Sequence, residues 1–463
     1  MRRAATLVAA LALAGCAALT PPHERPPLPV PERYPVEAVP AGTAGVAAAD
    51  LDWAQFFADP RLKRLIALAL ASNRDLRVAV LNIEQARALY DVRRADAWPT
   101  VGVGATASRQ PSSAGSVASS YAVGLAVSGY ELDLFGRVRA LGEAALAQYL
   151  ASAETRQAVQ ISLVASVANT YLALRADEEL IAVTRQTLET REDAARLTKL
   201  RFDNGASSEL DFRQSESLLE AARVALAQAL RQRLLDENAL QLLVGQPLPA
   251  DLPAPLPLDG GHLAADPPPG LPSELLERRP DVRAAERQLI GAEANIGAAR
   301  AAFFPRISLT GNLGSASSEL TGLFKNGSFA FTGTAQLLQP LFDAGRNRAN
   351  LEVAQVNREI AIAQYERSIQ TAFREVADAL AGRATLGEQL RAQAAQVNAL
   401  AIAYRLADLR YRAGAASYLD TLDAQRSLFA AQQALVQTRA LALQNAVTLY
   451  RALGGGWTAP PPS

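Results

Sequence analysis

The sequence predicts a mainly α-helical protein with a small β part, in which a tandem repeat of long coiled-coil helices is interrupted by short strands. Three observations predict this fold class. One motif occurs twice at a fixed distance, the prolines are confined to a few segments, and four short segments alternate apolar with polar residues. Two copies of a helical hairpin, each preceded by a pair of strands, account for all three observations.

The repeat is defined by two copies of the pattern R-x3-G-x2-S-x-L-D, which lie 209 positions apart. The first copy comprises Arg201, Gly205, Ser208, Leu210 and Asp211, and the second comprises Arg410, Gly414, Ser417, Leu419 and Asp420. Pro99 and Pro305 match instead at an offset of 206, so a three-residue insertion is expected between Pro305 and Gly345. It falls between two strand-like segments, where a hairpin loop tolerates extra residues.

The amino terminus predicts a lipoprotein signal peptide over residues 1–15. Two arginines precede an apolar run that is too short to span a bilayer, and Leu13-Ala14-Gly15-Cys16 resembles the bacterial lipobox. Cys16 is then the lipidated first residue of an extended segment, residues 16–52, and Ala17 after it favours sorting to the outer membrane. The alternative is an ordinary secretory signal with an incidental cysteine.

The prolines divide the rest of the chain. Nine of the 26 lie between Pro247 and Pro272, which defines an inter-repeat connector at residues 246–272. The first structural repeat is placed at 53–245, the second at 273–454, and a C-terminal tail at 455–463. Long proline-free stretches rich in alanine, leucine and glutamine predict helix, and abundant alanine lets neighbouring helices approach closely.

Within each repeat we expect a helix, two strands, a long helix, a tip and a returning helix. One helix of some 67 residues, roughly 100 Å long, could run from Arg137 to about Asp203. The tips are expected at 204–208 and 413–417, where glycine motifs break the long helices into hairpins.

The expected strands cover about 100–109, 120–132, 306–314 and 328–338, with apolar residues on one face and small or polar residues on the other. Their lengths suit a transmembrane barrel, although a soluble sheet with one buried face shows the same pattern. Four strands cannot close a barrel, since small closed barrels need about eight. A transmembrane sheet therefore requires oligomerisation, to eight strands in a dimer or twelve in a trimer.

Two groups of motifs, together with this architecture, carry a family resemblance. They are Asp133-Leu-Phe-Gly-Arg137 in the first repeat, and Tyr411-Arg-Ala-Gly414 with Tyr418-Leu-Asp420 in the second. The chain resembles the TolC-like outer-membrane efflux factors, in their lipoprotein branch of the NodT and OprM type. The resemblance implies a homotrimer with a trimeric α-barrel crossing the periplasm and a 12-stranded transmembrane β-barrel, to which each chain contributes four strands. It also implies a passive exit duct of a tripartite efflux or export system, served by a periplasmic adaptor and an inner-membrane pump.

In the family the returning helix carries inward aspartates at the periplasmic gate, and these match Asp420 and Asp423, with Leu419 beside them. Three copies would make two carboxylate rings that select cations. The competing interpretation is helix capping, because Ser208-x-x-Asp211 and Ser417-x-x-Asp420 both fit a capping box. Capping does not explain Asp423, whose equivalent in the first repeat is Gln214.

Five residues of the duplicated turns match the tips where the family meets its adaptor: Gly205, Ser208, Asp211, Gly414 and Ser417. Small residues there permit close approach of a partner helix hairpin. Ordinary helix-to-helix turns have the same composition, so that alternative stays open.

Composition and residue types argue against other functions. The chain has 46 basic and 46 acidic residues and no basic patch, so no nucleic-acid partner is expected. His23 and His262 lie in proline-rich connectors and Cys16 is taken by lipid, so we expect no enzyme, no metal and no cofactor beyond that lipid. A hydrolase using carboxylates alone remains open. The other class of function is a lipid-anchored periplasmic coiled-coil scaffold or adaptor without a pore.

Overall fold

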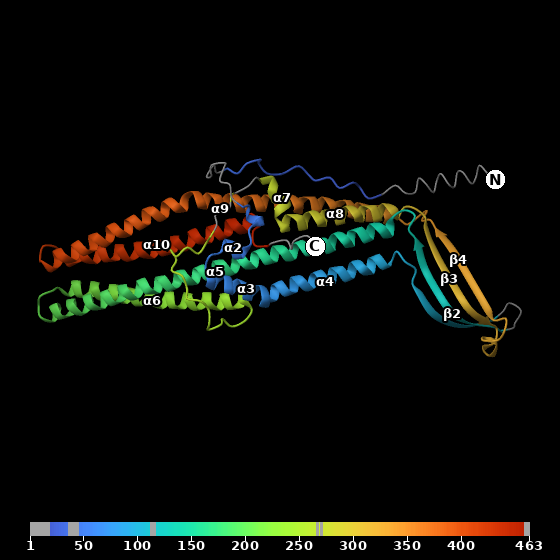
Figure 1. The fold of residues 1–463 in the computed structure, drawn as a ribbon, viewed down its shortest axis with the longest axis horizontal. Helices are drawn as coiled ribbons and strands as arrows, with labels where there is room; N and C mark the ends of the chain where they lie inside the picture. The colour runs from blue at the N-terminus through green and yellow to red at the C-terminus, as the bar shows by residue number, and fades with distance from the viewer. Residues whose placement is uncertain (1–18, 36–45, 112–116, 265–267, 269–271, 458–463) are drawn as a thin grey trace. The chain divides into compact units, whose positions relative to one another are not determined.

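The structure, a computed structural model, describes residues 19–35, 46–111, 117–264, 268 and 272–457 (Figure 1). The chain is mainly helical with one four-stranded antiparallel sheet, which confirms the predicted fold class. Cys16 and the predicted signal peptide lie outside the described residues.

The chain divides into two compact units. The first comprises the segment up to Pro27 with Leu81–Glu154 and Arg283–Arg367, and it contains the sheet. The second comprises Leu28–Val80, Thr155–Val282 and Ser368–Ser463, and it contains both helical tips. The helices α4, α5, α8 and α9 contribute residues to both units.

The helices of the first repeat are α2 (Trp53–Phe56), α3 (Pro60–Ser72), α4 (Arg74–Ala95), α5 (Arg137–Asp203) and α6 (Glu209–Val244). Those of the second are α7 (Leu275–Arg278), α8 (Pro280–Ala301), α9 (Arg346–Arg412) and α10 (Tyr418–Ala452). Three short 3₁₀ turns complete the described helical segments, at Ala48–Asp50, Pro272–Glu274 and Leu320–Gly322.

The two longest helices, α5 and α9, have 67 residues each and begin in the same way. A left-handed glycine precedes each helix, and an aspartate accepts hydrogen bonds from its first backbone N–H groups. At α5 the aspartate is Asp133, which binds the N–H groups of Val138 and Arg139 at 3.0 and 2.8 Å. At α9 it is Asp343, 2.9 Å from the N–H of Asn347. Satisfying otherwise unpaired donors fixes where each helix starts.

The sheet has the order β1-β2-β3-β4, and the four strands lie side by side (Figure 1). The bounds are β1 (Val101–Pro111), β2 (Val117–Leu132), β3 (Arg306–Ser317) and β4 (Phe329–Leu338). Three of the four strands extend beyond the ranges expected from the alternation. The turn between β1 and β2 includes residues outside those described.

The register of the strands resolves the expected three-residue insertion into two changes. Val101 pairs with Val127 in the first hairpin and Ile307 with Leu337 in the second, so the repeat offset is 206 on the first strands and 210 on the second strands. The offset returns to 209 because β2 carries a one-residue bulge between Val127 and Tyr130, which β4 lacks. The second repeat therefore gains four residues in its hairpin loop, and the first gains one in its bulge.

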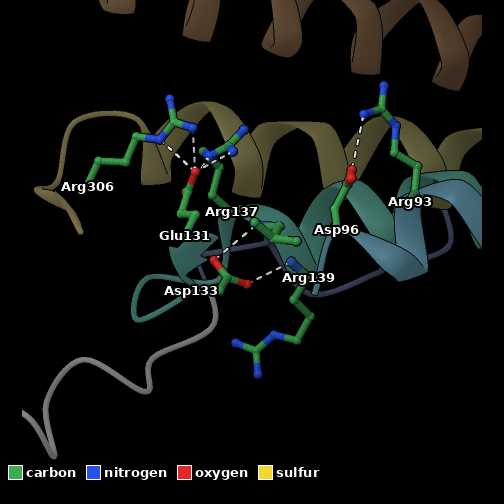
Figure 2. A network of polar contacts seen from close by, with 8 residues as sticks. Arg93, Asp96, Glu131, Asp133, Arg137, Arg139 and Arg306 are labelled. Atoms are coloured by element: carbon green, nitrogen blue, oxygen red, sulfur yellow. Dashed lines mark hydrogen bonds and ion pairs between the residues drawn. The ribbon is translucent and has the colours of Figure 1, made fainter. Parts of the chain in front are cut away.

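A polar network joins the sheet to the helices in the first unit (Figure 2). Glu131, near the end of β2, binds Arg137 of α5 through two hydrogen bonds of 2.8 and 2.7 Å. It also binds Arg306 at the start of β3 at 2.6 Å. The side chain of Glu131 is 10% exposed, so this two-arginine pairing compensates a largely buried charge and ties both repeats together.

Candidate functional site

The second hairpin tip is a glycine turn between α9 and α10. Gly414 adopts a left-handed φ of 71°, and the N–H of Ala415 donates to the carbonyl oxygen of Arg410 at 2.9 Å. This bond closes the C-terminus of α9 in the manner of a Schellman motif. Ser417 then caps α10, because its hydroxyl oxygen accepts from the N–H of Asp420 at 3.4 Å.

The start of α10 has two distinct faces. Tyr418, Thr421, Leu422 and Gln425 form the buried face. Leu419, 47% exposed, lies on the opposite face with Asp420 and Asp423. A helix brings positions 419, 420 and 423 to one side, since residues three and four apart are neighbours. The structure therefore places all three candidate gate residues together on one exposed surface.

The two gate carboxylates differ in their contacts. Asp423 forms an ion pair of 3.4 Å with Arg426, one turn along the helix, and both side chains are more than half exposed. Such a pair contributes little stability. Within the described part of the chain, no hydrogen bond or ion pair engages the carboxylate of Asp420. Of the two hydrogen bonds of the expected capping box, the one from the Asp420 N–H to the Ser417 hydroxyl is thus present. The reciprocal bond, from the Ser417 N–H to the Asp420 carboxylate, is absent among the described contacts.

The first tip has the same backbone and a different use of its aspartate. Gly205 has a φ of 69°, and the N–H of Ala206 donates to Arg201 O at 2.7 Å. Ser208 and Asp211 form the complete capping box. One carboxylate oxygen of Asp211 accepts from the hydroxyl and the N–H of Ser208, at 2.7 and 3.3 Å. Asp211 is therefore engaged in capping α6. All five candidate tip residues lie in the turns or in the first turn of the following helix: Gly205, Ser208, Asp211, Gly414 and Ser417.

Near the tips, hydrogen bonds of Arg201 and Tyr418 join the first hairpin to the second. The guanidinium of Arg201 on α5 donates to the hydroxyl of Tyr411 on α9 at 2.5 Å, and it also lies 5.1 Å from the centre of that ring. The hydroxyl of Tyr418 on α10 donates to Ser215 on α6 at 3.2 Å. Arg201 and Tyr411 belong to the sequence motifs, but no sequence pattern indicated that they contact each other.

Sequence reasoning missed a buried arginine above the tips. Arg191 of α5 is 3% exposed, donates to the carbonyl of Leu218 on α6 at 2.8 Å, and lies 5.1 Å from the ring centre of Phe429 on α10. Burial, and then repulsion from Arg426, lower the pKa of Arg191. The side chain thus contacts both return helices, and its position on a polar-rich helical segment gave no signal in the sequence.

The second unit contains a histidine, an aspartate and a tyrosine in contact, but all three are fully buried. Asp59 accepts from the Tyr171 hydroxyl at 2.8 Å and lies 3.0 Å from Nδ1 of His262. Burial alone would raise the pKa of Asp59, yet these bonds and two backbone N–H groups hold it below its usual value. Asp59 also caps α3, so the trio fixes the inter-repeat connector to that helix and offers no accessible nucleophile. Among the residues that the structure describes, no cluster of metal-binding side chains occurs.

Comparisons with known proteins by family model, sequence and structure agree with one another over most of the chain. The family model described as outer membrane efflux protein matches residues 65–246 and 271–455. The antibiotic efflux pump outer membrane protein ArpC of Pseudomonas putida is 47% identical over 459 residues, which cover 97% of this chain and 94% of the relative. The toluene efflux pump outer membrane protein TtgC, also of Pseudomonas putida, gives the same values.

Solved structures agree. The open state of the Neisseria gonorrhoeae MtrE outer membrane channel superposes with a TM-score of 0.87 at 43% identity, over 94% of this chain and 98% of that one.

Proposed function

This chain belongs to the family of outer membrane efflux proteins, and from that premise we propose that three copies form a passive exit duct with a carboxylate gate at the second hairpin tips. The chain is the outer-membrane component of an efflux pump. A poreless scaffold, the alternative that the sequence left open, finds no support in relatives that are efflux proteins or channels.

The open sheet supports assembly. Four described strands form an open sheet with β1 and β4 at its edges. Lipid cannot satisfy unpaired backbone groups at an edge, and four strands are too few to close on themselves. Three copies provide twelve strands, enough for a barrel with a lumen, while the long helices continue the duct through the periplasm.

The surface formed by Leu419, Asp420 and Asp423 carries the gate proposal. The carboxylates of Asp420 and Asp423 lie on an exposed helix face. The cap of α10 uses the backbone N–H of Asp420, so its carboxylate has no partner among the described residues. Three copies around an axis would place six carboxylates at a narrow opening. Like charges in a constriction attract cations and repel one another, so contacts such as Arg201 with Tyr411 would hold the duct closed. The open state of the similar MtrE channel supports a gate that moves.

Partners follow from the pump. We propose that a periplasmic adaptor contacts the tips at Gly205, Ser208, Asp211, Gly414 and Ser417, whose turns expose small residues. An inner-membrane pump would supply the energy, since the sequence carries no nucleotide-binding motif. Covalent lipid on Cys16 would add an anchor in the outer membrane.

The cargo is proposed from the relatives. ArpC is named for antibiotics and TtgC for toluene, which supports small organic toxicants as the class of compound exported. A wide aqueous duct contacts such cargo without selecting it, so the pump would determine specificity.

Single-channel conductance in planar bilayers tests the duct and the gate. We expect the wild type to conduct weakly with a preference for cations, and Asp420→Ala/Asp423→Ala to conduct more freely with less preference. Asp211→Ala is the matched control, since it removes the equivalent carboxylate from the first tip. If folded wild type does not conduct, the duct is wrong. If the double variant behaves like wild type, the duct stands and the gate assignment fails.

A further inference from the structure

The described N-terminal residues 19–25, which we call the strap, lie along α8 in the first unit. Arg300, near the end of α8, donates to the carbonyl oxygen of Leu19 at 3.0 Å. At the other end of the strap, the guanidinium of Arg25 donates to both carboxylate oxygens of Glu286, at 2.5 and 3.3 Å. The strap therefore runs antiparallel to α8.

Between these ends, the strap contacts α8 at two buried positions. Nδ1 of His23 lies 2.8 Å from a carboxylate oxygen of Glu293, whose side chain is 2% exposed. A carboxylate removed from water needs such partners, and its other oxygen lies 3.5 Å from Arg358 of α9. At Gly297, a Cβ atom would lie 3.0 Å from the backbone of Thr20, so a side chain there would push the strap away.

The strap and the helix also match in length. From Glu286 to Arg300 the helix advances 14 residues, or about 21 Å. From Leu19 to Arg25 the strap advances six residues, or about 20 Å when extended. Two prolines in the middle of the strap favour that extended form. The four contacts therefore fit one register of an extended strap.

The first repeat shows that this contact surface is specific to α8. Four residues form the surface, which we call the α8 seat: Glu286, Glu293, Gly297 and Arg300. Helix α4 is the equivalent of α8 at the repeat offset of 206, and both have 22 residues. There Val80 and Arg87 replace the two carboxylates, Asp91 replaces the glycine, and only the arginine is shared, as Arg94. All four positions on α4 are exposed.

The strap begins close in sequence to the proposed membrane anchor. Cys16 precedes Leu19 by three residues, which can span no more than about 11 Å. At the same end, α8 stops at Ala301, five residues before β3 begins. We propose that the α8 seat holds the strap in this single register, so that lipid on Cys16 is tied rigidly to the helix end from which the sheet continues.

The proposal rests on the lipid anchor proposed above and specifies how that anchor is connected to the duct. A flexible tether of the same length would let the anchor and the helix move independently. The two cases differ in the mobility of the strap, which can be measured without knowing the cargo.

Nitroxide labels at the two ends of the strap test its docking. Leu19→Cys and Glu24→Cys carry the labels in separate proteins, because Leu19 contacts α8 through its backbone carbonyl and Glu24 is exposed. In the full-length protein in outer membranes, we expect both labels to give slow-motion spectra. Rapid motion of both labels in the otherwise unchanged chain would overturn the docking itself.

Substitutions in the seat should release the strap. With Gly297→Leu or Glu293→Leu, we expect at least one label to move several-fold faster. The matched controls are Asp91→Leu and Arg87→Leu, at the equivalent positions of α4, and they should change neither label. Unchanged labels in both seat variants, with conductance retained, would show that the seat does not hold the strap.

Two insertions test the register. Two alanines placed between Pro21 and Pro22 lengthen the strap between its contacts, so both ends can no longer be seated and one label should become mobile. The same two alanines placed between Ala17 and Ala18 precede the strap and should change neither label. Slow motion of both labels with the first insertion would contradict a single register. Release of the strap by the second would mean that the anchor holds it instead of the seat.

The chain without an added cysteine separates the anchor from the strap. Lipid on Cys16 leaves no thiol, so we expect this protein to take up no label. Labelling of Cys16 would remove the lipid anchor, and with it the rigid connection, even if the strap is docked. The duct is tested independently by the conductance of the wild type.

Discussion

The two hairpin tips have the same backbone and different chemistry. Gly205 and Gly414 have φ values of 69° and 71°, and equivalent hydrogen bonds close α5 and α9. In the first tip, however, the carboxylate of Asp211 is bound by Ser208, whereas in the second tip the carboxylate of Asp420 is not engaged by its capping serine. The duplicated motif therefore preserves the turn. The acidic residue of the motif caps its helix in the first tip, whereas in the second tip its carboxylate is exposed and takes no part in the cap.

The largest expected effect comes from exchanging the residues that differ between the tips. Asp423→Gln copies Gln214 into the second tip and should reduce the cation preference of the duct several-fold. Gln214→Asp copies the acid into the first tip and should leave the preference near that of wild type. Reversal potentials in a salt gradient measure both. An increase with Gln214→Asp as large as the decrease with Asp423→Gln would mean that both tips line the opening.

The contacts between the tips give the next largest effect. Tyr411→Phe removes a hydrogen bond from the Arg201 guanidinium, and Tyr418→Phe removes one to the Ser215 hydroxyl. Bonds to charged groups contribute about 1.5–3 kcal/mol and neutral ones about 0.5–1.5 kcal/mol. Hydrogen exchange of the tip amides should therefore show more opening in Tyr411→Phe than in Tyr418→Phe. The resting conductance of Tyr411→Phe should also be the higher of the two.

Equal effects of the two tyrosine variants would contradict this order. Tyr404→Phe, on the same helix α9 but with no part in either hydrogen bond, is the control for loss of a hydroxyl. If that variant opens the tips as much as Tyr411→Phe, the cause is a general weakening of α9 rather than the contact between hairpins.

How much the sequence predicted follows from the range of the interactions involved. The span expected from Arg137 to about Asp203 agrees with α5, because glycine and proline act locally on the helix. The alternation located the strands for the same reason. The extra residue of the β2 bulge partly offsets the four extra residues of the second hairpin loop. The sequence therefore showed only the net insertion of three residues and not the two changes that produce it.

Contacts between distant segments were not accessible to the sequence patterns. Arg201 and Tyr411 are 210 positions apart, and Asp59 and His262 are 203 apart. The candidate gate residues Leu419, Asp420 and Asp423 came from the family resemblance, and the structure places them on one exposed face because residues three and four apart are neighbours on a helix. The buried Arg191 was missed because its partners, a backbone carbonyl and an aromatic ring, come from two other helices.

The two hairpins also differ, away from their tips, in a titratable residue: Asp177 of α5. Burial, and then the neighbouring Asp236 carboxyl, raise the pKa of Asp177 from 3.8 to about 7. The equivalent positions in the second repeat are Leu386 and Asn445, which do not titrate. Because the folded state binds the extra proton between these pKa values, the stability of the α5 and α6 pairing falls as pH rises from about 4 to about 7.

Asp177→Asn makes the first hairpin resemble the second and should remove this pH dependence. At pH 8 the variant should be more protected against hydrogen exchange by on the order of 1–3 kcal/mol, the range for a buried polar group without a partner. At pH 5, where Asp177 is protonated, the two proteins should agree. Asp193→Asn, an exposed change on the same helix, is the matched control. A gain that is equal at both pH values would point to packing instead of charge.

The smallest effects concern the caps themselves. Ser208→Ala and Ser417→Ala each remove a hydroxyl that accepts a backbone N–H, and such caps contribute about 1 kcal/mol. Ser208→Ala should cost more, because it also leaves the Asp211 carboxylate with one bond fewer, and hydrogen exchange in the first turns of α6 and α10 would measure both. Conductance should change little in Ser208→Ala. A larger loss of stability in Ser417→Ala than in Ser208→Ala would mean that the position of Asp420 depends on its capping serine. The two tips would then differ only in how strongly each serine holds its aspartate.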